Sequence, residues 1–364
     1  MRTFLFSFVV LAMGAVLTRA DESQPAKSGR LALVAGGGTS VEDGPARQVK
    51  LISPFGVGFA PDGSIVFVEM VGERVRRIDR DGQVHTVAGD GRKGDQGDNG
   101  PASSARFNGI HTLAVAKNGD ILVSDTWNNR VRKIDAKTGQ ISTIVGTGKK
   151  GFSGDGGPAA KADFGGIYCI DLDETNQRLY LADLDNRRIR VVDLTTGIVS
   201  TLAGNGKKGI PQDGADARTS PMVDPRAVAS DKKGNVYILD RGGNALRVVD
   251  REGKIRTLVG TGAKGATGDG GPGREATLNG PKHLCIAPNG DVIIADTENH
   301  KIRVYHPSTG IIDALAGTGS TGQAGVGQLP TEAQFNQPHG VTLASDGTLY
   351  ISDSSNHRIL KLVP

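Results

Sequence analysis

The sequence has few aromatic residues and almost no cysteine. Phe, Trp and Tyr make up 4% of its 364 residues, and its two cysteines are Cys169 and Cys285. Two cysteines cannot form the disulfide framework that stabilises small secreted domains. Basic residues are not clustered either, because no run of Lys or Arg exceeds three residues and the formal net charge is +4. A charge this mild argues against nucleic acid as a partner.

Long apolar runs are absent after the N-terminus. Arg2 precedes a largely apolar run from Phe4 to Leu17, and Thr18 and Ala20 place small residues where a signal peptidase cleaves. A membrane span needs about 20 apolar residues, so the run predicts a cleaved signal peptide over residues 1–20, with an uncleaved anchor as the alternative. Residues 21–30 then form a polar leader, and the protein is expected to be secreted or periplasmic, without a transmembrane segment.

Glycine is abundant, with 53 residues, and it marks a repeat. A glycine inside a helix costs about 1 kcal/mol relative to alanine, so the composition favours short strands joined by glycine-rich turns. Triplets of two apolar residues and glycine recur with glycine spacings of 53, 57, 58, 56 and 57 residues. The six triplets are Val34–Gly36, Val87–Gly89, Ile144–Gly146, Leu202–Gly204, Leu258–Gly260 and Leu315–Gly317. This period matches a four-stranded propeller blade with an added long loop.

Each unit repeats the same order of features. A loop of G-D-G-G-P-A character follows the glycine, and an apolar anchor follows 18 positions after the glycine in five units and 15 in the first: Leu51, Phe107, Phe164, Met222, Leu278 and Phe335. An inner strand and a second strand come next, joined by turns that often contain Asn-Gly or Asp-Gly. A third and a fourth strand lead to the next triplet. The sequence therefore predicts an all-β, six-bladed β-propeller of four-stranded blades over residues 31–364.

The start of the third strand carries a family resemblance. Asn299–Ile302 and Asn356–Ile359 are similar to the signature of NHL repeats, and Asn128–Val131 and Asn186–Ile189 are close variants. The first and fourth units depart from it. The resemblance covers residues 31–363 and implies an NHL-type six-bladed propeller of the bacterial secreted type. Extracellular NHL modules, including sensor domains of bacterial kinases, imply a binding or interaction role, although the fold alone does not fix a function.

The two ends of the repeat region complement each other. The last copy ends with its third strand, Arg358–Val363, whereas residues 31–36 match the fourth strand of every other copy. Residues 31–36 are therefore predicted to complete the sixth blade, which closes the ring and removes an open strand edge. We expect removal of residues 21–36 to lower the thermal stability sharply.

Positions that recur in every unit favour structural roles. The second strand always ends in an acid, which predicts a turn cap that accepts backbone N–H groups: Glu69, Asp125, Asp183, Asp240, Asp296 and Asp353. The G-D-G-G-P-A loops lack the dense carboxylates of a calcium loop and do not join a strand to a helix as phosphate loops do. Cys169 and Cys285 fall on inner strands of blades that are not adjacent, so both are expected to be buried free thiols.

One position varies from blade to blade. Four residues after the anchor the chain reaches the channel mouth on the face that carries the long loops, with the residues Phe55, His111, Tyr168, Arg226, Lys282 and His339. They either cap the channel or form an electropositive pocket in which Arg226 holds a carboxylate or phosphate. Trp127, in a turn on the same face, either packs structurally or stacks on a sugar or a peptide side chain.

Metal binding has candidates at this mouth. Pro338–Gly340 resembles the zinc-ligand context of peptidyl-hydroxyglycine amidating lyase propellers, which makes His111 and His339 candidate ligands. The third ligand position holds Arg226, and the column of that family's catalytic Tyr has none here: Val71, Trp127, Asp185, Gly242, Glu298 and Ser355. Gluconolactonase-like propellers bind a divalent cation through carboxylates and amides, which the mouth residues lack. We therefore expect no zinc or calcium cofactor.

The sequence thus predicts a monomeric binding or interaction module. Its ligand is expected to be a protein, a peptide or an anionic carbohydrate, held by the long-loop face and the channel mouth. The alternative is a propeller enzyme, either a metal-dependent lyase or a lactone hydrolase, that uses the same mouth residues. No Ser-His-Asp arrangement can be assigned from the sequence.

Overall fold

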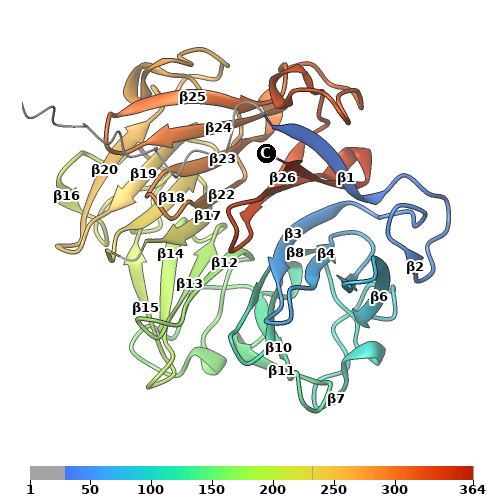
Figure 1. Cartoon of the computed structure of the whole chain (residues 1–364). Helices are drawn as coiled ribbons and strands as arrows, with labels where there is room; N and C mark the ends of the chain where they lie inside the picture. Colours follow the sequence, from blue (N-terminus) through green and yellow to red (C-terminus); the bar gives the residue numbers. More distant parts are fainter. Residues whose placement is uncertain (1–28, 232, 364) are drawn as a thin grey trace, which may run out of the picture.

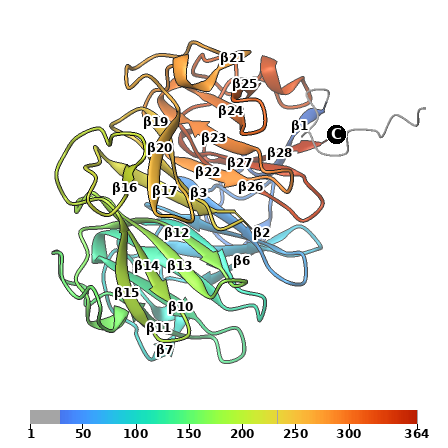
Figure 2. The ribbon, with the colours of Figure 1, turned by 90° about the vertical axis from the view of Figure 1, so that its left-hand side faces the viewer.

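The computed structural model describes residues 29–231 and 233–363, which form six β-sheets arranged in a closed ring. Figures 1 and 2 show the sheets following one another in chain order until the first strand and the last strand lie side by side. The innermost strand of each sheet contacts that of the next sheet, and the sixth contacts the first. The predicted six-bladed β-propeller is therefore confirmed.

The first three blades follow one pattern, with each strand antiparallel to its neighbours from the channel outwards. Blade 1 contains β3 (Pro54–Phe59), β4 (Ile65–Glu69), β5 (Arg74–Ile78) and β6 (Gln83–Ala88). Blade 2 contains β8 (Ile110–Val115), β9 (Ile121–Asp125), β10 (Arg130–Ile134) and β11 (Gln140–Val145). Blade 3 contains β12 (Ile167–Asp173), β13 (Arg178–Asp183), β14 (Arg188–Asp193) and β15 (Ile198–Ala203).

The last three blades repeat this pattern. Blade 4 contains β17 (Pro225–Ser230), β18 (Val236–Asp240), β19 (Ala245–Val249) and β20 (Lys254–Val259). Blade 5 contains β22 (His283–Ile286), β23 (Val292–Asp296), β24 (Lys301–His306) and β25 (Ile311–Ala316). Blade 6 contains β26 (Pro338–Leu343), β27 (Leu349–Asp353), β28 (Arg358–Val363) and β1 (Arg30–Gly36).

The ring closes where the sequence predicts it. β1 pairs antiparallel with β28, with Leu31 opposite Leu362 and Ala35 opposite Ile359. Most of the polar leader and the whole predicted signal peptide lie outside the described residues, whereas Arg30 belongs to β1. No helix among residues 29–231 and 233–363 is long and apolar enough to cross a membrane.

Four blades have a fifth strand that the sequence analysis did not predict. The long loops descend along the outer strands and pair with them as two-residue strands: β2 (Gly44–Pro45), β7 (Gly100–Pro101), β16 (Ala215–Asp216) and β21 (Gly271–Pro272). Blade 3 has a single bridge from Pro158 to Ile198 at the same place. Seven 3-10 turns complete the described structure: η1 (Ala102–Ser104), η2 (Thr126–Asn128), η3 (Ala159–Lys161), η4 (Gly273–Glu275), η5 (Thr297–Asn299), η6 (Pro330–Glu332) and η7 (Ser354–Asn356). The loops thus shield outer strand edges that would otherwise be open to pairing.

The recurring apolar anchors and triplets lie in the core. Each anchor is fully buried: Leu51, Phe107, Phe164, Met222, Leu278 and Phe335. The glycine of each triplet is needed for two reasons. The backbone has a positive φ there, and it packs closely against the turn before the third strand of the same blade. At Gly204, φ is 93°, and a Cβ would lie 2.1 Å from the carbonyl oxygen of Arg187. Any larger residue would clash with this backbone.

The acidic residues that end the second strands are structural, but their partner differs from the prediction. In blade 2, Asp125 accepts the backbone N–H of Asn108 at 2.9 Å. This donor lies 17 residues earlier, at the entry of the inner strand, rather than two residues later in the turn. Every blade has the same contact, with Glu69, Asp183, Asp240, Asp296 and Asp353 as the other acceptors. The acids therefore fix the path by which the chain enters the channel.

A buried arginine on the third strand neutralises these acids. Arg132 lies 3.9 Å from Asp125 and 2.9 Å from Asp98 of the long loop. Arg76, Arg190 and Arg303 make the equivalent pairs with the second-strand acid of their own blade and with an acid of its long loop. The aspartate of these loops thus pairs with an arginine and holds the loop against its blade, which agrees with the structural interpretation of the loops.

Candidate functional site

A backbone irregularity turns the mouth residues towards the channel. In blades 3, 4 and 6 the pairing register shifts at the second residue of the inner strand, which holds Tyr168, Arg226 and His339. Blades 1 and 2 shift over two residues that include Phe55 and His111. A bulge leaves its residue without a ladder partner and redirects its side chain. This position can therefore vary without disturbing the sheets.

The structure brings all six mouth residues together in a ring. Phe55 stacks on His339 at 4.1 Å between ring centroids and meets His111 edge-on at 5.2 Å. The His111 and Tyr168 rings are 4.8 Å apart, and the Arg226 guanidinium lies 4.5 Å above the Tyr168 ring. Lys282 Nζ lies 3.2 Å from His339 Nε2, so five contacts connect the six side chains. The channel is narrowed at this end by side chains in mutual contact.

Trp127 borders the ring. Its indole N–H donates to the Tyr168 hydroxyl at 3.3 Å, and its ring lies edge-on to His111 at 5.6 Å. The side chain still exposes 43% of its surface. Trp127 is therefore both packed against the mouth and accessible from outside, so both sequence-based interpretations of this residue have a structural basis.

The two mouth histidines are neutral. Burial, and then the charge of Arg226, hold the pKa of His111 well below its usual range. Burial, followed by Lys282 and Arg226, has the same effect on the pKa of His339. The Nδ1 atoms lie 2.8 Å from the carbonyl oxygens of Gly109 and Gln337, so each Nδ1–H donates to backbone. His339 Nε2 is left as the acceptor for Lys282.

A metal ion has no set of ligands at this mouth. Among residues 29–231 and 233–363, no group of three His, Cys, Asp or Glu side chains is placed to hold a metal ion. The position that would complete a zinc site with His111 and His339 holds Arg226, and Lys282 Nζ contacts His339 Nε2. The donor set present does not fit zinc or calcium.

Arg226 differs from the other buried arginines. The residue is 4% exposed, yet within the described structure it makes a single hydrogen bond, from Nη1 to the Tyr168 carbonyl oxygen at 3.3 Å. Its Nε is buried without a partner. None of the ion pairs within the described part of the chain includes it, whereas Arg132 pairs with two acids. Burial, and then the charge of Arg241, lower the pKa of Arg226 to about 10. A buried guanidinium without an anion is energetically unfavourable.

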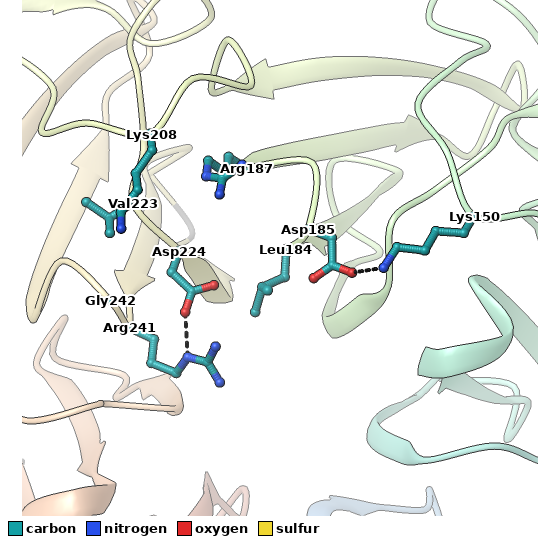
Figure 3. Close-up of a pocket in the computed structure, with 9 residues that line it drawn as sticks. All are labelled: Lys150, Leu184, Asp185, Arg187, Lys208, Val223, Asp224, Arg241 and Gly242. Carbon is teal, nitrogen blue, oxygen red and sulfur yellow. Dashed lines mark hydrogen bonds and ion pairs between the residues drawn. The ribbon is translucent and has the colours of Figure 1, made fainter.

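A pocket of about 690 Å³ lies beside the mouth, between blades 3 and 4. Figure 3 shows its lining, which consists of Lys150, Leu184, Asp185, Arg187, Lys208, Val223, Asp224, Arg241 and Gly242. Two ion pairs cross the lining, from Lys150 to Asp185 at 2.7 Å and from Arg241 to Asp224 at 2.6 Å. Arg241 links the pocket to the mouth, because its charge lowers the pKa of Arg226 and of Lys282.

The sequence analysis missed this pocket, although a signal for it exists. Arg241 follows the acid of the second strand, where blades 2, 5 and 6 have Thr126, Thr297 and Ser354. These hydroxyls donate to the inner strand of the next blade, as Thr126 does to the Ile167 carbonyl oxygen at 2.8 Å. A charged residue at this position stands out when the six repeats are compared, as Arg226 does among the mouth residues.

The channel contains a smaller cavity of about 300 Å³, which the inner strands of all six blades line. Cys169 and Cys285 both line it as free thiols, which confirms the prediction that they are not disulfide-bonded. Cys169 is buried and Cys285 is only half-buried, so the expected burial is wrong for the second thiol. Burial raises the pKa of both thiols to about 12, so neither is a reactive thiolate.

Asp171 in this cavity predicts a pH-dependent stability. Burial raises its pKa to about 6, against hydrogen bonds from the N–H of Ser230 at 2.9 Å and its Oγ at 2.6 Å. A raised pKa in the folded state stabilises the protein below the unfolded pKa, and this stabilisation is lost as the pH rises through about 6. Asp171→Asn should therefore gain about 2 kcal/mol in free energy of unfolding relative to wild type at pH 8 and almost nothing near pH 4.

Urea denaturation at several pH values measures this difference. Neutral histidines with a lowered pKa, such as His283, make a contribution to stability that rises with pH. This contribution is the same in variant and wild type, so it cancels when the two are compared at one pH. Glu332→Gln, which removes the same charge at an exposed site, is the control and should give a constant difference. A stability difference for Asp171→Asn that does not change with pH would contradict the assignment.

Comparisons with known proteins identify the repeats. The NHL repeat family matches residues 107–134, 278–305 and 335–362, and the teneurin NHL domain family matches residues 159–266. Human NHL repeat-containing protein 2 is 27% identical over 328 residues, which cover 81% of this chain and 44% of that protein. SUPPRESSOR OF QUENCHING 1, a chloroplastic protein of Arabidopsis thaliana, is 29% identical over 281 residues, or 74% of this chain and 26% of that protein. The chain thus spans less than half the length of either relative.

Solved structures share the fold. An auxiliary nutrient binding protein from Bacteroides thetaiotaomicron superposes with a TM-score of 0.67 at 18% identity, covering 91% of this chain and 75% of that one. A gluconolactonase from Xanthomonas campestris superposes with a TM-score of 0.58 at 12% identity, covering 92% of this chain and 89% of that one. At such identities the likeness extends to the fold and not to the activity.

Proposed function

We propose that this chain, a six-bladed β-propeller that carries NHL repeats, is a binding module that holds an anionic ligand at its channel mouth. The observation that carries the proposal is Arg226, a buried guanidinium that has one hydrogen bond, a free Nε and no carboxylate partner among residues 29–231 and 233–363. An anion from solution would provide the missing partner. Arginine suits this role because its planar fork can hold a carboxylate or phosphate through two hydrogen bonds.

The surroundings of Arg226 support an anionic ligand. Lys282 adds a second cation, which Glu298 holds at 2.6 Å, and the neutral mouth histidines add no competing charge. The aromatic ring of Tyr168 covers one face of the guanidinium, excludes water there and so strengthens its attraction for an anion. Trp127 offers an exposed ring at the edge of the mouth on which a sugar or a peptide side chain could stack.

The binding role and the location of the protein outside the cytoplasm are part of the same proposal. One protein of the same fold is described as an auxiliary nutrient binding protein, which is consistent with a binding role. The N-terminal sequence supports a secreted or periplasmic protein, since Arg2 and the apolar run to Leu17 have the pattern of a signal peptide. The ligand would then be an extracellular or periplasmic anion, either free or part of a macromolecule.

A thermal-shift screen tests the proposal. Carboxylates, sulfates and phosphates, including acidic saccharides and acidic peptides, are added to the purified protein. A ligand at 100 times its Kd should stabilise the fold by about 2.7 kcal/mol. Arg226→Ala combined with Lys282→Ala should abolish this stabilisation. Arg256→Ala combined with Lys264→Ala removes the same charge at exposed sites and should leave it intact. An anion that stabilises the first double variant as much as wild type would show that the site is elsewhere.

The enzyme alternative predicts a different result. A metal-dependent lyase or lactone hydrolase would need a bound divalent cation, for which the described residues offer no ligand set. Metal analysis of the purified protein separates the two functions. Stoichiometric zinc or calcium would overturn the binding-module proposal in favour of the enzyme.

A further inference from the structure

The junction between blades 3 and 4 lacks a contact that joins other blades. At four junctions, the turn before the third strand contains a residue with a left-handed backbone conformation. The side chain of this residue accepts a hydrogen bond from a backbone N–H of the next blade. Glu73 accepts from Gly109 at 2.9 Å, and Asn244 accepts from Gly280 at 3.0 Å. His300 and His357 make the equivalent contacts at 3.2 Å and 3.1 Å. The turn that leads into β14 has Arg187 at this position, and a guanidinium has no acceptor atom.

The pocket between blades 3 and 4 opens at this junction. The N–H of Asp224, which an acceptor at position 187 would bind, instead donates to Asp240 at 2.6 Å. Asp224 also lines the pocket and pairs with Arg241. The chain has thus replaced a contact between blades by a cavity lined with charged side chains. Among the described residues, the junction between blades 2 and 3 also lacks this contact, but Asn129 there keeps an acceptor oxygen. Arg187 replaces the acceptor by a cation, and this replacement points to a function at the junction.

The pocket carries more positive than negative charge. Lys150, Arg187, Lys208 and Arg241 face Asp185 and Asp224 in its lining. Two of these cations are paired with the two acids, whereas Arg187 and Lys208 form no ion pair within the described part of the chain. The Nε of Arg187 is buried and has no hydrogen-bond partner. In Figure 3, Arg187 and Lys208 lie on the same side of the pocket, away from both dashed ion pairs.

The lining favours a saccharide over a peptide. Leu184 and Val223 are the apolar side chains of the lining, which is too little for the aromatic and aliphatic anchors that dominate peptide binding. The ion pairs Lys150–Asp185 and Arg241–Asp224 each present donors and acceptors together, as sugar hydroxyls require. The volume of about 690 Å³ lies within the range of small-molecule sites.

We propose that this pocket binds an acidic sugar unit, with Arg187 and Lys208 holding its carboxylate or sulfate group. The inference rests on the proposed function, because the neighbouring unit of the same oligosaccharide would place its own anionic group at Arg226. Arg241 lines the pocket, and its charge acts on Arg226 at the mouth. The ligand class is thus an acidic oligosaccharide of at least two units.

Calorimetric titration of the purified chain tests the inference with a trisaccharide of galacturonic acid. The neutral trisaccharide with reduced carboxyl groups, a sulfated disaccharide and a glutamate tripeptide serve as comparison ligands. The double variant Arg187→Asn and Lys208→Ala removes the two unpaired cations. Asn at position 187 keeps the left-handed backbone, because Asn129 and Asn244 adopt the same conformation in blades 2 and 4. The control, His357→Asn with Lys264→Ala, changes the equivalent turn of blade 6 and the equivalent loop of blade 5.

We expect an acidic saccharide to bind at least about tenfold more tightly than the neutral one, because its anionic groups would complete the unpaired cations. The double variant should weaken that binding at least about tenfold, because it removes both cations that would hold the anionic group. The control double variant should bind within about twofold of wild type, with all three proteins folded by circular dichroism.

Other results would overturn the inference in distinct ways. Unchanged affinity in the double variant, combined with a loss on changing Arg226, would leave the mouth site standing and remove the pocket. Tighter binding of the glutamate tripeptide than of either acidic saccharide would show that the ligand class is wrong, as would equal binding of the neutral trisaccharide. Failure of every anion to bind would reject the proposed function together with the inference.

Discussion

Removal of Arg30–Gly36 is expected to lower the melting temperature by about 8 °C or more, or to abolish cooperative unfolding. β1 is the outer strand of blade 6 and pairs along the whole length of β28. It buries Leu31 and Ala35 completely in the core. Burial of a leucine alone stabilises a fold by about 1.5–3 kcal/mol, and the lost strand hydrogen bonds add to this. The variant would also expose the edge of β28, which invites association of chains.

Differential scanning calorimetry of chains that start at residue 30 and at residue 37 measures the effect. The first chain is the control, because it keeps β1 intact. A synthetic peptide with the sequence of Arg30–Gly36 should restore part of the lost stability when added to the second chain, since it can pair with β28. Melting temperatures within about 2 °C of each other would contradict the assigned role of β1.

Arg226→Met should strongly weaken ligand binding and at the same time stabilise the protein. The lost charge–anion contact is expected to weaken binding by about 30-fold or more. The unliganded protein should gain about 1–3 kcal/mol in free energy of unfolding, because methionine fills the site without an unpaired buried charge. A residue that destabilises the fold but is needed for binding is typical of a functional site.

The matched control is Arg303→Met. Arg303 is buried to the same degree but pairs with Asp269 at 2.7 Å and with Asp296 at 3.6 Å. Its loss leaves the buried Asp296 without its ion-pair partner, so this variant should lose about 3–5 kcal/mol. Urea denaturation gives both stabilities, and titration with the anion found in the thermal-shift screen gives the affinity. Destabilisation of Arg226→Met by a similar amount would assign Arg226 a structural role instead.

The repeat explains how much of the molecule could be predicted. Strand order, ring closure and the ring of mouth residues depend on spacing within a blade, and six copies of one register define them. The two-residue strands were missed because Gly100–Pro101 pairs with β11 through a loop whose path does not follow from its composition. Likewise, the acceptor of the Asn108 N–H lies 17 residues later, at Asp125, and this proximity arises only in three dimensions.

The candidate site was only partly predictable for a related reason. Arg226 was expected at the mouth from its position, but whether an acid lies beside it depends on side chains from neighbouring blades. The pocket depends on a hydrogen bond that is missing between blades 3 and 4, because Arg187 cannot accept the N–H of Asp224. A missing contact of this kind leaves no periodic signal in the sequence. Comparison of equivalent positions, such as Arg241 with Thr126, is the type of sequence reasoning that could have located it.

The pairing of β1 with β28 also determines how the propeller is oriented when it is fused to another protein or attached to a surface. Arg30 lies opposite Val363, so the two ends of the described chain emerge together. They emerge at the end of blade 6 remote from Asn356 and the mouth, because β28 runs from that turn towards the opposite face. A tether or fusion at either end would therefore hold the propeller with its candidate binding face pointing outwards. Immobilisation through a tag attached next to Arg30 or Val363 should leave that face accessible to ligands in solution.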